Sequence, residues 1–340
     1  MVEILRSKKQ KEADHFPTRL EVLREYDKRH ALNDKYKDEL KRLEAGHRGE
    51  MLVLDYLNEY GLPHWKVIKN IWIEHYGIFE CDLLLITGDD WYPIEIKHYS
   101  GQYALKEMQW SCYGNLLPNN PISQSQKVFI HFNNLARDNH MPVNIKGSII
   151  FTGDHFDLDI VDDVADLKIV RLNQLRDYIR ELAWKEQHTY SKKIDVDRIL
   201  NFIEKYETSN PFPAEDLYEK LGDKLTKGVN CCHCGSFDID TDGTYVSCHC
   251  GMHEPHDMSI IRTICEYGVI HFKEDLFTRE VFDFFDGNFS EPTIRKYLNK
   301  YFERIGKGRG SRYRSHGRIL DSVESIFDFD RPKYFICQKK

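Results

Sequence analysis

Residues 80–99, ECDLLLITGDDWYPIEIKHY, carry the most informative pattern in this chain. Its two apolar runs, CDLLLI and WYPIEIKHY, predict strands, and Gly88-Asp89-Asp90 between them predicts the turn of a hairpin. Because side chains alternate along a strand, Glu95 and Lys97 share one face of the second strand. Pairing of the two strands then brings Asp82 beside Glu95 and Lys97.

This group of charges on an otherwise apolar sheet predicts a binding site, because charged side chains are costly to bury unless they bind something. Two carboxylates can hold a hard divalent cation through oxygen, and a lysine can orient water or offset the charge of a phosphate. Glu50, in a preceding segment with a helical pattern, could supply a further carboxylate. The alternative is a surface hairpin with a weak, exposed Glu–Lys salt bridge, and the spacing alone does not choose between the two.

Helices and short apolar strands alternate around this hairpin up to about residue 205, which predicts an α/β core. VIKNIWI, NIKGSIIFTGD and DLKIVRL predict further strands, and EMLVLDYLNEYG and KVFIHFNNLARDN predict helices. Residues 1–44 are dense in charge with a helical stripe of Leu32, Tyr36, Leu40 and Leu43, which predicts an exposed helix or helical hairpin packed on the next domain. A coiled-coil dimer arm is the alternative. The two prolines of ETSNPFPAEDLYEK predict a linker over residues 206–225.

Four motifs in order along the chain carry a resemblance to a known family. They are His47-Arg48-Gly49-Glu50, Cys81-Asp82-Leu83-Leu84, Ile94-Glu95-Ile96-Lys97-His98-Tyr99-Ser100-Gly101 and Asn120-Pro121-Ile122-Ser123-Gln124. Over residues 45–150 the sequence resembles the nuclease-related domain (NERD) family, a branch of the PD-(D/E)xK nuclease fold. That family usually has Ile-Asp-His in the second motif and Lys-Asn at the end of the third, whereas this chain has Cys81-Asp82-Leu83 and Lys97-His98.

The resemblance implies a nuclease domain over residues 45–205, with a mixed sheet flanked by helices. It implies a catalytic set of Glu50, Asp82, Glu95 and Lys97, with Gln124 as an accessory residue on the following helix. Mg²⁺ or Mn²⁺ would be held by Asp82 and Glu95 with a contribution from Glu50, and Lys97 would position the attacking water in phosphodiester hydrolysis. Members of this superfamily can lose catalysis and keep the fold, so a non-catalytic protein is the alternative.

Five of the nine cysteines lie between Cys231 and Cys250, and such a cluster predicts a metal site rather than a disulfide framework. The ligands expected for tetrahedral Zn²⁺ are Cys231, Cys234, Cys248 and Cys250. The segment 226–256 resembles a zinc ribbon, although its second knuckle is C-x-C instead of C-x2-C. Cys232 could replace Cys231, and His249, His253 or His256 could replace a thiolate.

Residues 257–320 predict a basic helix-turn-helix module. Ser290 is a suitable N-cap for a helix whose basic face carries Arg295, Lys296 and Lys300. Beyond this helix, Arg304, Lys307, Arg309, Arg312 and Arg314 lie among glycines, and the segment resembles the wing of a winged helix. The expected partner is nucleic acid, and DNA fits better than RNA because such a helix suits the B-form major groove. A role in protein interaction and a plain solvated surface are the alternatives. Residues 321–340 form a C-terminal tail.

The formal net charge of −7 conceals a strong asymmetry. Between Arg295 and Arg318, nine Arg or Lys residues face one acid, Glu303, which makes this stretch +8 and leaves −15 for the rest. An acidic body joined to one basic module can steer towards nucleic acid. Apolar runs are too short to span a bilayer, and the N-terminus has no apolar signal region, which predicts a cytoplasmic protein.

Together these features predict a metal-dependent DNA nuclease, targeted by a zinc ribbon and a winged helix, in DNA processing or defence. The competing hypothesis is a catalytically inactive nuclease fold that acts as a DNA-binding, regulatory or adaptor protein. A partner protein or a homodimer is compatible with both.

Overall fold

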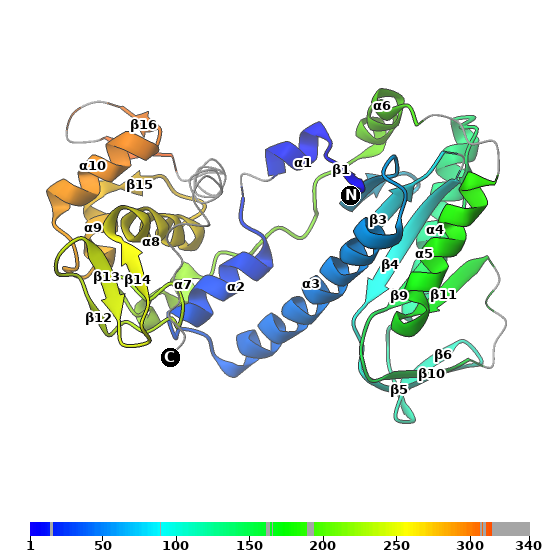
Figure 1. Cartoon of the computed structure of the whole chain (residues 1–340), viewed down its shortest axis with the longest axis horizontal. Coiled ribbons are helices and arrows are strands. Elements are labelled where there is room, and N and C mark those ends of the chain that lie inside the picture. Colours follow the sequence, from blue (N-terminus) through cyan, green and yellow to red (C-terminus); the bar gives the residue numbers. More distant parts are fainter. Residues whose placement is uncertain are drawn as a thin grey trace. The chain divides into compact units, whose positions relative to one another are not determined.

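The computed structural model describes residues 1–314 apart from 14–15, 89, 161–163, 165, 189–193, 307 and 309–310. The chain forms two compact units (Figure 1). Unit 1 comprises Met1–Glu12 and Arg42–Pro211, and unit 2 comprises Ala13–Lys41 and Phe212–Lys340. The boundary expected between residues 44 and 45 falls inside α3 (Asp34–Tyr60), which is one continuous helix.

Unit 1 is built on a mixed sheet whose strands are ordered β1-β2-β3-β4-β9-β11, with β8 paired to β4. β2, β3 and β4 form an antiparallel meander, whereas β4, β9 and β11 run parallel. The strands are β1 (Glu3–Leu5), β2 (Lys66–Glu74), β3 (Ile78–Ile86), β4 (Asp90–Lys97), β8 (Asn144–Ile145), β9 (Gly147–Phe151) and β11 (Leu167–Arg171). The strands and the hairpin predicted around Asp82 and Glu95 are therefore confirmed.

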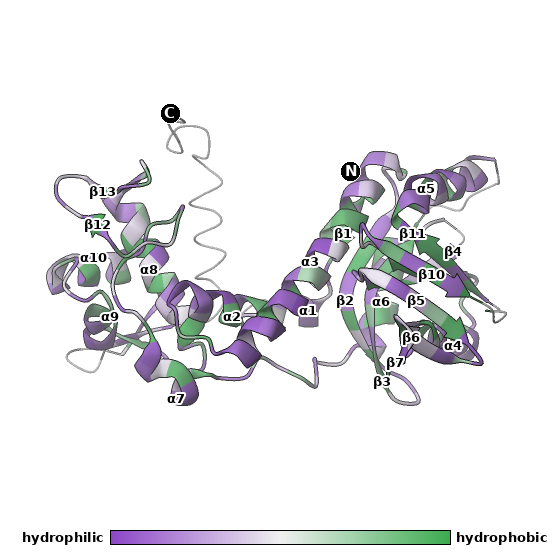
Figure 2. Cartoon of the chain, turned by 90° about the horizontal axis from the view of Figure 1, so that it is seen from below, coloured by the Kyte–Doolittle hydropathy of each residue, from purple (hydrophilic) through white to green (hydrophobic). Residues whose placement is uncertain are grey.

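Helices cover both faces of this sheet. α3 and α5 (Leu172–Gln187) pack on one face, and α4 (Pro121–Asp138) and α6 (Val196–Tyr206) pack on the other. The Leu83–Ile86 run of β3 is buried throughout because alternate residues point into two different cores. Figure 2 shows both colours of the hydropathy scale along α3, as expected of an amphipathic helix, whereas α1 (Lys8–Ala13) is mostly hydrophilic.

A second, smaller sheet follows β4 in unit 1. Its order is β10-β5-β6-β7, with β5 (Gly101–Lys106), β6 (Gln109–Cys112), β7 (Asn115–Leu116) and β10 (Phe156–Ile160). It packs on the main sheet through an aromatic cluster, in which Tyr103 and Trp110 stack with ring centroids 5.2 Å apart. Because β5 begins four residues after Lys97, this sheet lies beside the end of β4 that carries the predicted site.

Unit 2 surrounds a central helix, α8 (His256–Ile270), which is mostly buried from Ser259 onward. The other helical elements are α2 (Arg19–Lys28), α7 (Tyr218–Leu221), η1 (Gly222–Lys224), α9 (Thr278–Phe284) and α10 (Glu291–Tyr301). One antiparallel sheet consists of β12 (Ile239–Asp240), β13 (Tyr245–Cys248) and β14 (His253–Pro255), and the other of β15 (Leu276–Phe277), β17 (Arg312–Tyr313) and β16 (Arg304–Ile305). Within the described residues, every helix is too short or too polar to span a bilayer.

Two parts of the chain differ from the expected organisation. The boundary between the units, after Pro211, falls inside the predicted linker 206–225, but Leu217 and Leu221 within that segment are buried in unit 2. The helical segment expected at residues 1–44 is divided, because β1 pairs in parallel with β2 of unit 1 while α2 packs against α8 of unit 2. Both differences arise from contacts between residues far apart in the sequence.

Candidate functional site

The predicted carboxylate site lies where two strands separate. β3 and β4 pair from Leu83↔Ile94 to Ile86↔Trp91, and beyond Ile94 the strand β4 remains paired only with β9 among the described strands. Asp82 and Glu95 are the first residues past the last pair. The Ile96 amide donates to Asp82 Oδ2 at 2.8 Å. Where the β3–β4 pairing ends, the side-chain carboxylate of Asp82, instead of a main-chain carbonyl of β3, therefore accepts the hydrogen bond of the Ile96 amide.

Glu95 and Lys97 form an ion pair in this opening. Lys97 Nζ lies 2.6 Å from Glu95 Oε1, and the Glu95 side chain is only 3% exposed. Burial and the neighbouring Asp82 raise the pKa of Glu95 to about 7, although Lys97 opposes this shift. Burial alone would lower the pKa of Lys97, but Glu95 and Asp82 outweigh it and the pKa of this lysine is raised. Lys97 is therefore a cation at neutral pH.

Glu50 approaches the opening from α3, and a glycine permits the approach. A Cβ on Gly49 would lie 2.6 Å from Thr152 Oγ1 and 3.1 Å from the Cβ of His98, so any larger residue would push α3 away from the ends of β4 and β9. Burial and the charge of Asp82 raise the pKa of Glu50. In this motif, Gly49 thus allows α3 to pack closely, and the adjacent Glu50 supplies a carboxylate.

Replacing Gly49 with alanine tests this packing. We expect G49A to lower the free energy of unfolding by about 1–3 kcal/mol, because the added methyl group overpacks the contact with Thr152. Gly46 is the matched control, since it lies in the same helix and a Cβ there meets no atom within 4 Å. G46A should stabilise the protein by up to about 1 kcal/mol, because alanine is the better helix former. Urea unfolding measures both, and equal effects would contradict the close approach of α3.

Two neighbouring residues belong to the site although sequence patterns did not single them out. Glu80 precedes Asp82 by two positions on β3, and burial together with Asp82, Glu95 and Glu50 raises its pKa to about 7. Asn70 lies opposite Asp82 with a left-handed φ of 48°, and its side chain hydrogen-bonds Glu50. The two-residue spacing of Glu80 and Asp82 was a visible signal for the first, whereas nothing in the sequence marked the conformation of Asn70.

The carboxylates are electrostatically close without forming a tight cage. Their mutual repulsion raises several pKa values, yet no three of their oxygens lie as close together as the four thiols described below, as far as the described residues extend. The donor set suits a hard divalent cation, which would relieve the repulsion through oxygen ligands. Such an ion would compete with Lys97 for the carboxylate of Glu95.

Gln124 makes no polar contact with this group among the described residues. It is exposed in the first turn of α4, a helix that Asn120 caps by accepting hydrogen bonds from the amides of Ile122 and Ser123. Within the described part of the chain, no hydrogen bond or ion pair links its side chain to Glu50, Asp82, Glu95 or Lys97. The structure therefore brings together the four charged residues of the predicted set, and Gln124 remains a prediction.

The four predicted cysteines meet in unit 2. One sulfur atom from each of Cys231, Cys234, Cys248 and Cys250 lies within 4.8 Å of the other three. The Cys231–Cys250 and Cys234–Cys248 Sγ distances are both 3.6 Å. The main-chain amide of Ser236 and the neighbouring thiols lower the pKa of Cys234 to about 7, whereas burial raises the pKa of Cys248 to about 12. This group could hold a zinc ion with tetrahedral sulfur ligands.

The alternative ligands considered from the sequence do not join this group. His253 Nδ1 lies 2.9 Å from Ser247 Oγ, and His256 stacks edge-on against Phe289. His249 is exposed and lies near Asp238, and Cys232 is likewise outside the four-sulfur group. The C-x-C spacing therefore supplies both ligands of the second knuckle. Gly251 makes this turn possible through a φ of 89°.

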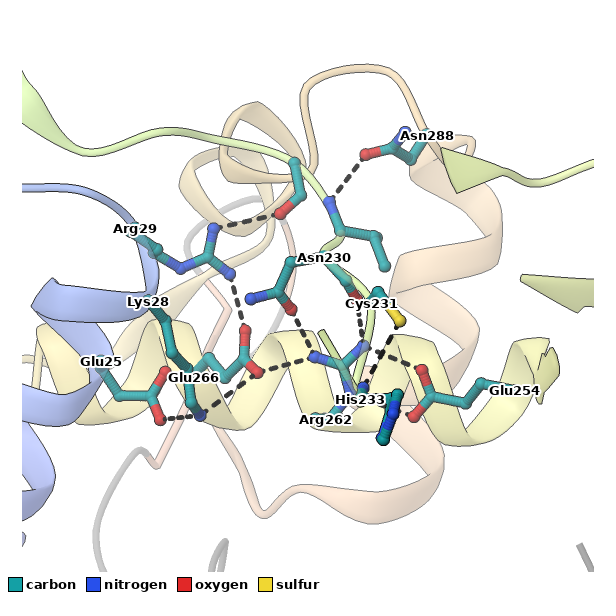
Figure 3. Close-up of polar contacts among 12 residues, drawn as sticks. Glu25, Lys28, Arg29, Asn230, Cys231, His233, Glu254, Arg262, Glu266 and Asn288 are labelled. Carbon is teal, nitrogen blue, oxygen red and sulfur yellow. Dashed lines mark hydrogen bonds and ion pairs between the residues drawn. The ribbon is translucent and has the colours of Figure 1, made fainter. Parts of the chain in front are cut away.

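A buried network of charges supports the first knuckle (Figure 3). Arg262 of α8 donates to both carboxylate oxygens of Glu254, to Glu266 and to the carbonyl and side-chain oxygens of Asn230, next to Cys231. Glu266 also accepts from Arg29 at 2.7 Å. Arg29 is fully buried at the end of α2 and stacks over the ring of Phe284, 4.0 Å from its centroid. The network thus joins the knuckle to α8 and to α2.

The predicted basic residues are only partly free to meet a phosphate. Arg295 pairs with Glu291, Arg312 with Asp275 at 3.0 Å and Arg314 with Glu303 at 3.3 Å, while Arg304 donates to Ser311 Oγ. Lys296 and Lys300 instead lie over the rings of Tyr297 and Tyr301, which stack on each other. Ser290 begins α10 without a side-chain capping bond and contacts Thr293 Oγ1 instead. Lys307 and Arg309, like the tail 321–340, lie outside the described residues.

Comparisons with known proteins bear on unit 1. Searches of curated proteins and of solved structures return no significant match. Residues 45–152 match the family model of the nuclease-related domain, NERD. The matched segment begins within α3 and ends after β9, so it contains Glu50, Asp82, Glu95, Lys97 and Gln124. The resemblance expected from the four motifs is thus supported for this third of the chain, which is similar to a nuclease-related domain.

Proposed function

We propose that unit 1 is a metal-dependent nuclease that hydrolyses phosphodiester bonds in DNA. The observation that carries the proposal is the opening between β3 and β4, where Asp82, Glu95 and Lys97 meet within a domain that matches the nuclease-related family. Buried carboxylates close to one another are unfavourable unless a cation or a substrate compensates them. A nuclease site accounts for all three side chains.

Asp82 and Glu95 are the proposed ligands for Mg²⁺ or Mn²⁺, and Glu50 adds a further carboxylate from α3. The ion, when bound, would polarise the phosphate and lower the pKa of a water molecule. Lys97 keeps its proton because two carboxylates raise its pKa, so it can orient water by donating a hydrogen bond and can offset charge on the phosphate. The Ile96 amide holds Asp82 in place.

Unit 2 is the proposed targeting module. Zn²⁺ at the four cysteines would be structural, because all four ligand positions are filled by protein sulfur. α9, the turn after it and α10 resemble a helix-turn-helix, and the β15-β17-β16 sheet resembles a wing. Lys296 and Lys300 are the proposed leading contacts to the DNA backbone, because the nearby arginines already pair with acids. The family match supports an interaction with nucleic acid and does not distinguish DNA from RNA.

One observation favours the competing function, a catalytically inactive nuclease fold that binds DNA. The salt bridge to Lys97 engages Glu95, and the carboxylates do not form a tight three-ligand group among the described residues. In that case the charged opening would be a remnant, and unit 2 would carry the function through DNA binding or contact with a partner protein.

Cleavage assays separate the two functions. Plasmid DNA and single-stranded DNA are incubated with the full-length protein in Mg²⁺, in Mn²⁺ and in EDTA. We expect products with Mg²⁺ or Mn²⁺ and none with EDTA, because the carboxylates need a cation to accept a phosphate. DNA binding without cleavage in every metal would reject the nuclease and support the inactive fold.

A further inference from the structure

A tyrosine occupies an unusual position in the small sheet beside the carboxylates. Tyr113 and Gly114 form the two-residue loop between β6 and β7, closed by the pair Cys112↔Asn115. Both residues have positive φ, 46° for Tyr113 and 77° for Gly114. Loops of this kind favour Asn, Asp or Gly at the first position, and a tyrosine there is conformationally costly. A costly residue at an exposed loop suggests a role for its side chain.

The ring of Tyr113 is both exposed and held in place. The side chain is 67% exposed. Three ring-side atoms, Cε2, Cζ and Oη, lie 3.0–3.3 Å from the position that a Cβ would take on Gly101, so the ring rests on the main chain there. The amide of Tyr113 donates to the carbonyl of Gln102 at 2.8 Å. The loop is therefore anchored to β5, and the ring stays accessible.

A row of aromatic rings connects this position with the carboxylates. Tyr99 follows Lys97 by two residues. Burial raises the pKa of Tyr99, and the charges of Lys97, Glu95 and Asp82 also act on this pKa. Tyr99 stacks on Tyr103 with centroids 5.3 Å apart, and the Tyr113 ring lies against Gly101, between these two residues in the sequence. The exposed ring thus rests on the start of β5, four residues beyond Lys97.

The surface around Tyr113 suits an uncharged, flat ligand. Leu116 is 66% exposed, Leu117 is 40% exposed, and no residue from Cys112 to Asn120 carries a charge. The residues of this loop therefore offer a phosphate no opposite charge. A protein partner is disfavoured, because three side chains are far fewer than a stable interface needs. A nucleobase has the required flat and apolar face, and stacking on an exposed tyrosine is independent of base identity.

We propose that Tyr113 is a stacking platform for an unpaired nucleobase of a strand bound at the carboxylate opening. The proposal rests on the proposed nuclease function and narrows its substrate class to single-stranded nucleic acid or frayed ends. In an intact duplex both faces of each internal base are covered by neighbours, so Tyr113 has nothing to stack on. The platform therefore selects strands whose bases are already open.

Binding measurements with the full-length protein test this platform. Ca²⁺ replaces Mg²⁺ to suppress cleavage, and the probes are a single-stranded oligonucleotide and a blunt duplex, each containing 2-aminopurine as a reporter of stacking. The key variant is Tyr113→Asn, because asparagine suits the loop better than tyrosine and should leave the thermal unfolding temperature unchanged or higher. Tyr113→Phe keeps the ring. Tyr76→Asn is the matched control, since Tyr76-Gly77 is another exposed Tyr-Gly turn with a left-handed tyrosine (φ 54°).

Tyr113→Asn is expected to weaken single-strand binding roughly 5- to 100-fold and to abolish the stacking signal, whereas duplex binding stays constant. Tyr113→Phe and Tyr76→Asn should bind like the unmodified protein. The 2-aminopurine signal reports the stacking contact itself and so complements the measured affinity. Equal binding by Tyr113→Asn, or equal weakening for single strand and duplex, overturns the platform.

The outcome also distinguishes failure of the platform from failure of the nuclease proposal. Tyr113-dependent single-strand binding without cleavage in any metal would reject the nuclease and leave the platform standing. Cleavage of duplex DNA by a protein that does not bind single strands would reject the platform and leave the nuclease standing.

Discussion

Replacing Lys97 with alanine is expected to lower metal-dependent cleavage roughly 100- to 1,000-fold while DNA binding persists. Lys97 is the cation of the opening, held 2.6 Å from Glu95 Oε1 with its pKa raised by two carboxylates. Without it, nothing in the described surroundings of Glu95 replaces its role of orienting water and offsetting phosphate charge. Glu95→Gln should have a similar effect, because it keeps the side-chain volume and removes a proposed metal ligand.

The control for this experiment is another lysine of unit 1. Lys106 on β5 forms an exposed pair with Asp159 at 3.5 Å, and such pairs contribute little. K106A should therefore cleave like the unmodified protein. Circular dichroism melting curves establish that K97A and E95Q are folded. If folded K97A keeps more than about a tenth of the activity, Lys97 is not part of the catalytic machinery and the site must be reassigned.

Loss of the metal at the four cysteines is expected to unfold much of unit 2. Structural zinc contributes on the order of 10 kcal/mol to the folding of small metal-binding segments. Cys234→Ser removes one ligand, and the strands beside the knuckles are only two to four residues long, so the metal is a main support of this segment besides the Arg262 network. Elemental analysis should find one zinc per chain in the unmodified protein and none in C234S.

The extent of unfolding is the informative readout. Hydrogen exchange in C234S should increase at the knuckles and α8, and also at α2, because Arg262 and Glu266 connect the segment next to Cys231 with Arg29. Cys232→Ser is the matched control, since Cys232 is adjacent to a ligand but outside the four-sulfur group. C232S should keep its zinc. Unchanged exchange at α2 in C234S would show that the buried network does not couple the helix to the metal site.

The predictable parts of this molecule are those encoded by short-range patterns. Asp82, Glu95 and Lys97 sit on adjacent strands of one hairpin, so alternation and a turn signal suffice to place them together. The four cysteines span twenty residues and meet through two tight turns. In both cases, the local backbone conformation determines which side chains meet.

The unpredicted parts depend on contacts between distant segments or on single backbone conformations. β1 pairs with β2, and α2 packs on α8; both contacts join residues far apart in the sequence. The periodicity of side chains within a segment does not indicate which distant segment it will contact. The left-handed conformation of Asn70 opposite Asp82 is a property of one residue. Likewise, the basic pattern after Arg295 gives no sign that several of the arginines pair with acids.

The location of α2 constrains how the protein can be made. Val22, Leu23 and Tyr26 are completely buried in the finished unit, and the nearby Arg29 finds its carboxylate partner 237 residues later. During synthesis on the ribosome, this helix therefore emerges long before α8 has been translated. Until then its apolar side chains stay exposed to solvent. Contacts of such high sequence separation are slow to form and expose the nascent chain to aggregation. A protein shortened to begin at residue 45 would retain the nuclease-related segment and leave the core of its C-terminal half open.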